Sequence, residues 1–377
     1  MEKSRTHTHL PTASVPELLA QLRAGRMIVL LDASWRKNEA KLVLPAECAG
    51  AESINFMARH AKGLICLALT RQRCQELGLP LLRQVGEVPH DRGPAFTASI
   101  EAAEGVSTGI SAADRALTIQ RAALGTARDI VQPGHVFPVQ AVDGGVLMRP
   151  GHTEAACDLA VMAGYRPAAA VCAILRSDGS VACAADGRAF ARKHGLKLGH
   201  IDDLIVHRMR HEALVHKVAT CPLQTHYGAF TAQAYREAYS NRLHMALIKG
   251  RWLAGDAVEV RIHDALSPLD ILGISQGQSE ADSLHATLRH MQRQSRGLAI
   301  LLNCHEDSAR AFQGMSQLAR CGPDRPCGTM LAWQRQGVGL HILRDCQVGR
   351  PQFSRERLSL WKKGENGLAV ADKYAPR

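Results

Sequence analysis

The chain has 377 residues, of which 46% are hydrophobic and 21% charged, a size and composition typical of a globular protein with two domains. It contains no apolar run near the roughly 18 residues of a membrane-spanning helix and no signal-peptide pattern, so we expect no membrane segment. The net charge of +11 is compatible with an anionic ligand or with a merely basic surface, and a 4% aromatic content without basic blocks argues against nucleic acid.

The 11 cysteines are scattered along the chain, and none forms a C-x-x-C pair. Cys66, Cys157 and Cys172 lie inside apolar runs, where a reduced thiol packs as a small hydrophobic side chain. We therefore predict free thiols and a cytoplasmic location.

The first predicted domain spans residues 14–212, after a polar tail at residues 1–13 that we expect to be flexible. Ser14 and Glu17 match a capping box with a proline in the first turn, which predicts a helix to about residue 24. The segment 27–47 reads as a strand, a polar turn and a second strand. Patterns of helix and strand periodicity then follow at residues 52–62, 64–70, 95–102, 112–124, 154–163, 168–175 and 187–194.

The second predicted domain spans residues 222–377 and follows a helical segment at about 201–217 and a linker at 213–221. Its patterns predict strands at 228–235, 245–248, 258–263 and 298–302, a helix at 284–294 and a turn at 337–339. Strands interleaved with amphipathic helices predict a layered α/β fold for both domains, the second smaller than the first.

The densest group of polar residues is R-P-G-H-T-E at 149–154, which places a guanidinium, an imidazole and a hydroxyl at the start of a predicted helix. The first N–H groups and the dipole of such a helix favour an anion. Two turns of small residues, Q-P-G-H-V-F-P at 132–138 and T-G-I-S-A-A-D-R at 108–115, carry a histidine, hydroxyl groups and charges. Each alone is better explained as a helix cap or a satisfied turn, but together with Glu101 and Glu104 they indicate a functional site.

Four segments resemble 3,4-dihydroxy-2-butanone 4-phosphate synthase of riboflavin biosynthesis, namely residues 54–70, 100–115, 132–138 and 151–160. The resemblance covers about residues 14–212, and its motifs are too long for a chance match. The second half resembles GTP cyclohydrolase II, in the degenerate form that is often fused behind the synthase. This resemblance is carried by P-L-Q-T-H-Y-G-A-F (222–230), V-R-I-H (260–263) and G-V-G-L-H-I-L-R-D (337–345).

The resemblance to the synthase implies a homodimer, formed through the N-terminal domain, that uses Mg²⁺ to convert D-ribulose 5-phosphate into formate and 3,4-dihydroxy-2-butanone 4-phosphate. The ligand would be a small phosphorylated sugar, whose phosphate group Arg149 and Thr153 would hold with Arg36 close by. Catalytic candidates carried over from the family are His135, His152 and Cys66. The substrate-binding residues implied in full are Asp32, Arg36, Glu39, Thr108, Asp114, Arg149, Thr153 and Glu154.

The sequence departs from the synthase family at acidic positions. The family's D-D-E-D-R-E-N-E-G-D aligns with D-A-S-W-R-K-N-E-A-K at 32–41, so the metal-binding glutamate becomes Lys37 and the acid/base aspartate becomes Lys41. A third family acid becomes Ala173. At about 4 Å and an effective dielectric near 20, each unit-charge pair is worth roughly 4 kcal/mol, and twice that for a divalent ion. We therefore predict that the Mg²⁺ site is lost, with His152 the only retained candidate ligand and no cofactor expected.

The second half departs from its own family in a similar way. Working GTP cyclohydrolase II domains bind zinc through C-x₁₀-C-x-C, whereas the aligned residues 263–279 contain no cysteine and place Leu266 at the first ligand position. We therefore predict loss of the zinc site and of GTP cyclohydrolase activity.

Two functions follow from these departures. In the first, the N-terminal pocket binds a ribulose 5-phosphate-like sugar and performs altered lyase chemistry without Mg²⁺ in a flavin-related or specialised pathway. Lys37 or Lys41 would then be a catalytic amine or an electrostatic substitute for the metal, although a solvated loop position explains each lysine equally well. In the second, the protein is a catalytically inactive paralogue that binds a metabolite or a partner enzyme and regulates or scaffolds flavin metabolism.

Overall fold

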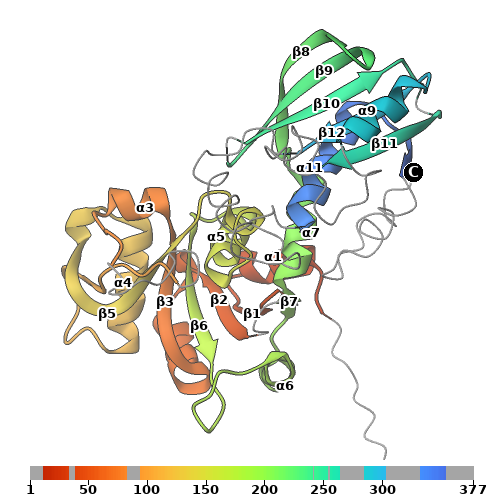
Figure 1. The fold of residues 1–377 in the computed structure, drawn as a ribbon. Coiled ribbons are helices and arrows are strands. Elements are labelled where there is room, and N and C mark those ends of the chain that lie inside the picture. Colours follow the sequence, from red (N-terminus) through yellow and green to blue (C-terminus); the bar gives the residue numbers. More distant parts are fainter. Residues whose placement is uncertain are drawn as a thin grey trace, which may run out of the picture. The chain divides into compact units, whose positions relative to one another are not determined.

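The computed structural model describes residues 12–33, 39–82, 94–240, 242–253, 255–263, 284–302 and 332–353, with side chains from residue 337 in the last range. The chain folds into two compact units, Met1–Arg208 and Met209–Arg377, and each contains its own sheet with helices packed on it (Figure 1). The predicted α/β fold class is confirmed. No helix in the described residues is long and apolar enough to cross a membrane.

The first unit is built on a mixed sheet of seven strands in the order β4-β5-β3-β6-β2-β1-β7. The strands are β1 (Ile28–Leu31), β2 (Ala40–Pro45), β3 (Lys62–Thr70), β4 (Ile100–Ala102), β5 (Ile130–Ala141), β6 (Ala168–Ile174) and β7 (Leu198–His200). The pairs β1–β7 and β3–β5 are parallel, and the other neighbouring strands are antiparallel. This order brings segments that are far apart in the sequence to the same end of the sheet.

Helices pack on both faces of this sheet. They are α1 (Val15–Arg23), α2 (Ala51–Phe56), α3 (Arg71–Glu76), α4 (Ala112–Leu124), α5 (His152–Ala163), α6 (Ala184–His194) and α7 (Ile201–His211), the last running across the unit boundary. One face buries an apolar cluster that α2, α4 and α6 supply together with the strands. On the other face α5 packs against β2, β3 and β6, and α1 packs on α5.

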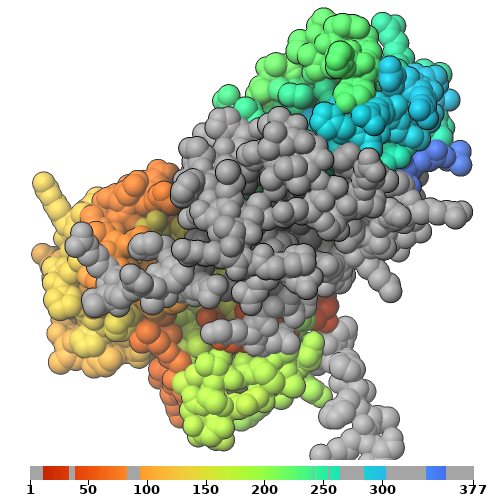
Figure 2. Space-filling model, viewed as in Figure 1, coloured from red at the N-terminus to blue at the C-terminus, as the bar shows by residue number. Residues whose placement is uncertain are grey.

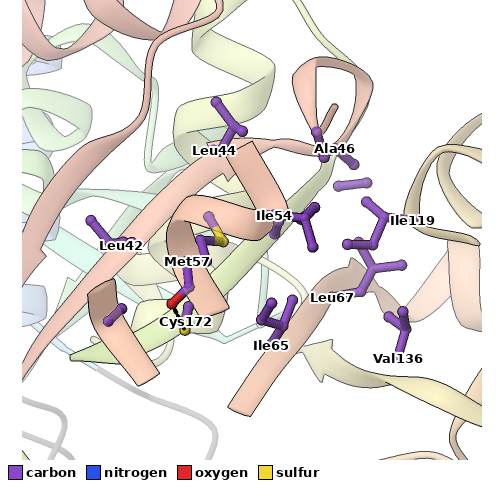
Figure 3. Packing of buried hydrophobic residues seen from close by; sticks show 14 of the residues in the cluster. Leu42, Leu44, Ala46, Ile54, Met57, Ile65, Leu67, Ile119, Val136 and Cys172 are labelled. Carbon is purple, nitrogen blue, oxygen red and sulfur yellow. Dashed lines mark hydrogen bonds between the residues drawn. The ribbon is translucent and has the colours of Figure 1, made fainter. Parts of the chain in front are cut away.

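The apolar cluster is built from alternate residues of neighbouring strands, because successive side chains of a strand point to opposite faces. Figure 3 shows Leu42 and Leu44 of β2 and Ile65 and Leu67 of β3 packed with side chains of the segment 51–61 and of α4. Burial of each such side chain contributes about 1.5–3 kcal/mol. This core fixes the strand register, and the register positions the polar residues at the strand ends.

The second unit is built on a sheet of six strands in the order β13-β11-β12-β10-β9-β8. Its elements are β8 (Val215–Thr225), β9 (Gly228–Glu237), β10 (Leu243–Lys249), β11 (Ala257–His263), α9 (Leu284–Gln292), β12 (Gly297–Leu301), α11 (Ala332–Asp345) and β13 (Arg350–Phe353). Ala299 and Leu301 of β12 join the cluster under α9, whereas Leu298 and Ile300 join the cluster under α11. The two helices therefore cover opposite faces of this sheet.

Most segments predicted from regular periodicity are helices or strands, and the segment predicted at 112–124 is helix α4 with the same bounds. The turn predicted at 132–138 is wrong, because these residues belong to β5, where a register shift against β4 between Ile100 and Glu101 accommodates them. The turn predicted at 337–339 lies inside α11, where a side chain on Gly337 would come within 2.7 Å of Leu214 and Met209. Most of the expected linker 213–221 lies in β8, and residues 1–11 of the expected tail lie outside the described residues.

Candidate functional site

Polar side chains gather along one end of the first sheet. Asp32 directly follows β1, and Lys41 near the start of β2 pairs with Ala173 near the end of β6. Cys66 lies on the next strand, β3, and pairs with the residue of β5 that is two positions after His135. Strand order and register thus place residues from distant parts of the sequence along the same sheet end.

His152 and Asp32 form a buried pair in this site. His152 is the first residue of α5, and its ring Nε2 lies 3.1 Å from the carbonyl oxygen of Leu30. In the tautomer that donates this hydrogen bond, Nδ1 is directed at the Asp32 carboxylate, whose Oδ1 lies 4.0 Å away and also accepts the N–H of Ala33. A ring nitrogen and a carboxylate oxygen that lie 4.0 Å apart leave room for a cation between them.

Lys41 and Glu39 form an ion pair beside this histidine–aspartate pair in the fold. The Nζ of Lys41 lies 3.6 Å from Oε2 of Glu39, and both side chains are partly exposed. The Glu39 carbonyl oxygen accepts the N–H of Asp32 at 2.9 Å, which ties the two ends of the loop together. Arg36 and Lys37, predicted to hold substrate and to act in catalysis, lie outside the described residues.

Arg149 lies just before α5 and is held by a buried glutamate. Its Nε and Nη2 donate to Oε1 of Glu154 at 2.9 and 2.7 Å, and the N–H of Val142 donates to the same oxygen at 3.0 Å. The other oxygen of Glu154, Oε2, is buried and has no hydrogen-bond partner in the part of the chain that the structure describes. Thr153 is the second residue of α5, where backbone N–H groups point out of the helix, so Thr153 and Arg149 both flank an anion-binding helix start.

Cys66 is not an activated nucleophile. Burial raises the pKa of its thiol to about 11, an effect that the nearby Lys41 ammonium only partly opposes. A thiol with this pKa is protonated near neutral pH, and the thiolate is the form that attacks. The structure therefore suits Cys66 to line the site wall better than to act as the catalytic residue that the family resemblance implied.

A second polar cluster surrounds His135 on β5. The ring Nδ1 of His135 lies 2.7 Å from Oε2 of Glu101, and the backbone N–H of His135 donates to the same oxygen at 3.2 Å. The other oxygen of Glu101 accepts the hydroxyl of Thr118 at 2.9 Å. The sequence patterns grouped Glu101 with Glu104 and the neighbouring turns as part of a functional site, and the contact with His135 now gives Glu101 a specific partner.

The loop over this second cluster is shaped by Asp114. Its carboxylate accepts the Ser107 hydroxyl at 2.8 Å and the N–H of Gly109 at 3.1 Å, and the Ser107 hydroxyl is the main cause of a pKa below the usual value for Asp114. Asp114 thus folds the loop that carries Thr108, whose side chain is exposed. Thr108 and Asp114, both predicted to bind substrate, therefore belong to the cluster around His135 and not to the one around His152.

The two clusters are separate within one chain. The strand order puts four strand-to-strand steps between β1, which ends before Asp32, and β5, which carries His135. At about 4.8 Å for each step this amounts to roughly 20 Å. The atoms of β4, α4 and β5, gold in Figure 2, form an exposed part of the surface. The side chain of His135 is 43% exposed, so it is open to a ligand or to another chain.

Metal-binding groups were sought among the same residues. The described ranges contain no group of three or more His, Cys, Asp or Glu side chains placed to hold a metal ion. The donor pair formed by Asp32 and His152 lies next to residues 34–38, which are outside the described residues. Of the region aligned with the zinc motif, 263–279, all but His263 is outside them as well.

Two family models match the chain. The model described as 3,4-dihydroxy-2-butanone 4-phosphate synthase matches residues 16–207, and the model described as GTP cyclohydrolase II matches residues 216–352. A 3,4-dihydroxy-2-butanone 4-phosphate synthase of Pseudomonas aeruginosa is 42% identical over 89% of this chain and 91% of its own length. The riboflavin biosynthesis protein RibBA of Aquifex aeolicus is 41% identical over 89% of this chain and 85% of its own length.

Two solved structures have folds similar to that of this chain. RibBX of A. baumannii, described as a two-domain 3,4-dihydroxy-2-butanone 4-phosphate synthase, is 38% identical with a TM-score of 0.73 and covers 90% of this chain and 93% of its own. A 3,4-dihydroxy-2-butanone 4-phosphate synthase in complex with two magnesium ions is 38% identical with a TM-score of 0.50, covering 52% of this chain and 97% of its own.

These similarities correct the predicted function. We expected altered chemistry or an inactive paralogue, and a second domain without GTP cyclohydrolase activity. Relatives about 40% identical over most of the chain are named as the synthase or as RibBA, which supports the ordinary riboflavin-pathway reaction instead. The expectation relied on single aligned positions, such as Lys37 and Lys41, against the similarity of the whole chain.

The predicted loss of both metal sites is wrong for the same reason. A similar synthase structure contains two magnesium ions, and the second unit matches a family whose domains use zinc. The charge argument treated Lys41 as an isolated ammonium, whereas its Nζ lies 3.6 Å from the Glu39 carboxylate. It also ignored Asp32 as an oxygen donor beside His152.

Proposed function

Because this chain belongs to the 3,4-dihydroxy-2-butanone 4-phosphate synthase family, we propose that it is an ordinary synthase of riboflavin biosynthesis. It would convert D-ribulose 5-phosphate into formate and 3,4-dihydroxy-2-butanone 4-phosphate. The observation that carries this proposal is the group at the start of α5, where Arg149, Thr153 and the His152–Asp32 pair converge. That group combines an anion site with acid/base and metal-binding donors.

The phosphate group of the sugar binds at the start of α5. The first N–H groups of a helix and its positive dipole end attract a phosphate, and an arginine binds it through two parallel hydrogen bonds. Arg149 supplies the guanidinium, and Glu154 fixes its orientation from the buried side. Thr153 adds a hydroxyl at the second position of the helix.

The His152–Asp32 pair fits a divalent cation. Carboxylate oxygens are the ligands that Mg²⁺ prefers, and the hydrogen bond from Nε2 to Leu30 orients the ring of His152 in the manner usual for a metal ligand. Bound there, the cation supplies a Lewis acid for a substrate oxygen. The ion pair of Lys41 with Glu39 flanks this pair.

His135 acts as an acid or base from a second copy of the chain. Within one chain His135 is roughly 20 Å from the α5 site along the sheet, which is too far for both to contact one small sugar. A homodimer formed through the N-terminal domain would bring the exposed His135 of one protomer to the α5 site of its partner. We also propose the cytoplasm as the location, supported by the free thiols of all described cysteines.

The test is release of formate from D-ribulose 5-phosphate by the purified full-length chain with Mg²⁺. We expect turnover by the wild type and at least a tenfold lower kcat/KM for Arg149→Met, which removes a charge-assisted phosphate contact. The control is Arg296→Met, because Arg296 forms a partly exposed ion pair with Asp256 in the second unit, outside the domain that carries the α5 site. A wild-type chain that binds the sugar phosphate but releases no formate would overturn the proposal.

A further inference from the structure

Glu101 is buried beside the exposed His135, and no established role explains it. The side chain is 11% exposed and lies on β4 at the register shift against the segment of β5 that carries His135. Burial of a carboxyl group is costly unless its oxygens accept hydrogen bonds. Both oxygens of Glu101 are satisfied here by named donors.

One oxygen of Glu101 fixes both the backbone and the ring of His135. Oε2 accepts the backbone N–H of His135 at 3.2 Å and lies 2.7 Å from its ring Nδ1. A carboxylate only accepts hydrogen bonds, so Nδ1 carries the proton in this contact. The neutral ring is then the Nδ1–H tautomer, and the lone pair of Nε2 is left on the far side of the ring.

The other carboxylate oxygen of Glu101, Oε1, is held by a residue of α4. Oε1 accepts the hydroxyl of Thr118 at 2.9 Å, and the oxygen of that hydroxyl accepts the N–H of Ala102, the next residue on β4, at 3.0 Å. The carboxylate therefore cannot rotate away from His135 without losing a second hydrogen bond.

Gly109 packs against the contact between Glu101 and His135. It adopts φ +87°, and a Cβ there would lie 2.0 Å from Oε2 of Glu101 and 2.7 Å from Nδ1 of His135. Its N–H donates to Asp114, which holds the loop in place. Only glycine fits against the pair, so the loop seals the Nδ1 side of the ring while the side chain of His135 stays open elsewhere.

We propose that Glu101 is a positioning residue that holds His135 in the Nδ1–H tautomer, so that Nε2 is the atom that takes up and returns protons in the reaction. This inference rests on the proposed synthase function for the role of His135. The arrangement is that of a base oriented by a carboxylate, in which the carboxylate sets tautomer and direction but does not contact substrate. A simple structural tie between β4 and β5 would need no particular tautomer.

The test compares Glu101→Gln with a matched control in the second unit. There, Oε2 of Glu259 lies 2.7 Å from Nε2 of His290, a pair with the same bond length and similar exposure that no proposed step uses. Formate release gives kcat and KM for D-ribulose 5-phosphate. Nitrogen-15 NMR of the ring, assigned by comparison with His135→Asn, gives the tautomer.

We expect the wild type to show the Nδ1–H tautomer and Glu101→Gln to lose it in part. We also expect a kcat at least roughly 100-fold lower for Glu101→Gln with KM changed less than about threefold, since an oriented base contributes this much. Glu259→Gln should keep kcat within about twofold. A wild-type ring in the Nε2–H tautomer overturns the proposal even if Glu101→Gln fails to fold.

An active wild type with an unchanged kcat in Glu101→Gln also overturns the proposal and leaves the synthase function intact. A wild type that releases no formate overturns the synthase function and, with it, the catalytic part of this role. The two failures are therefore distinguishable.

Discussion

Replacement of Glu154 by glutamine tests whether this buried carboxylate positions Arg149 for the phosphate group. Helix α5 offers a close control one turn later, at Asp158. Each carboxylate accepts one backbone N–H from the preceding segment and pairs with one arginine at 2.7 Å. The arginine paired with Asp158 is Arg208, which is not part of the proposed site, so the two variants separate stability from substrate binding.

The expected cost in stability follows from the surroundings of Glu154. Its oxygen Oε1 accepts three N–H groups at 2.7–3.0 Å, and Oε2 has no hydrogen-bond partner among the described residues. Glutamine would put an NH₂ group at the position of Oε2, and a buried donor without an acceptor costs about 1–3 kcal/mol. With the loss of the buried ion pair, we expect the free energy of unfolding to fall by about 3–5 kcal/mol. We expect a loss of similar size for Asp158→Asn.

The expected effect on binding differs between the variants. Without its anionic partner, Arg149 is free to adopt other rotamers, and a charge-assisted hydrogen bond to a phosphate is worth about 1.5–3 kcal/mol. We therefore expect Glu154→Gln to raise KM for D-ribulose 5-phosphate about 10- to 100-fold with a smaller change in kcat, because each 1.4 kcal/mol corresponds to a factor of ten. Asp158→Asn should leave KM within about threefold.

The assay combines urea unfolding followed by circular dichroism with steady-state formate release. An unchanged or lower KM for Glu154→Gln would refute the reasoning, since it would mean that the carboxylate is irrelevant to Arg149 or competes with the phosphate for it. An equal rise in KM for both variants would show that loss of α5 stability, and not release of Arg149, is responsible.

Three further predictions concern titration, thiol reactivity and metal dependence. Burial, and then the neighbouring His60, lower the pKa of His194, so the fold is more stable when His194 is neutral. This contribution to stability should be complete above the unfolded-state pKa near 6.5 and lost as pH falls below it. The urea midpoint of the wild type should therefore fall between about pH 7.5 and 5.5, and that of His194→Gln should change less over this range. Cys66, with a pKa raised to about 11, should react with iodoacetamide at pH 8 at least tenfold more slowly than the exposed Cys221, measured by mass spectrometry; equal rates would contradict its burial. Dialysis against EDTA should abolish formate release, and added Mg²⁺ should restore it in the wild type but not in His152→Asn; full activity after chelation would argue against a metal role.

The sequence was sufficient where local pattern decides the structure. The segment at 112–124 was predicted with its bounds because its apolar residues recur regularly, and the structure adds that Ser111 caps it as a helix. Strand β8 was missed because nearly all of its side chains are exposed on both faces, so no hydrophobic alternation marks it. Strand β5 was read as a turn because proline and glycine normally interrupt a strand, whereas here the register shift against β4 accommodates them.

The grouping of the site residues could not be read from the sequence. Asp32, Lys41 and Cys66 lie along one sheet end only because β6 inserts between β2 and β3, a choice of strand order that depends on the whole core. The separation of His135 from His152 has the same origin. Motif matching put both histidines in one pocket, but strand order puts each in a different cluster of the chain.

The error about magnesium shows how a charge argument depends on the partner of each charge. A lone ammonium about 4 Å from a divalent ion would oppose it by roughly 8 kcal/mol at an effective dielectric near 20. The Lys41 ammonium, however, lies 3.6 Å from the Glu39 carboxylate, so a cation near this pair meets a dipole, and attraction to one end offsets repulsion from the other. Arg149 is paired with Glu154 in the same manner. Next to His152 the structure also places Asp32, an oxygen donor whose Oδ1 lies 4.0 Å from Nδ1 of the ring, so a lysine in the loop does not by itself exclude a metal.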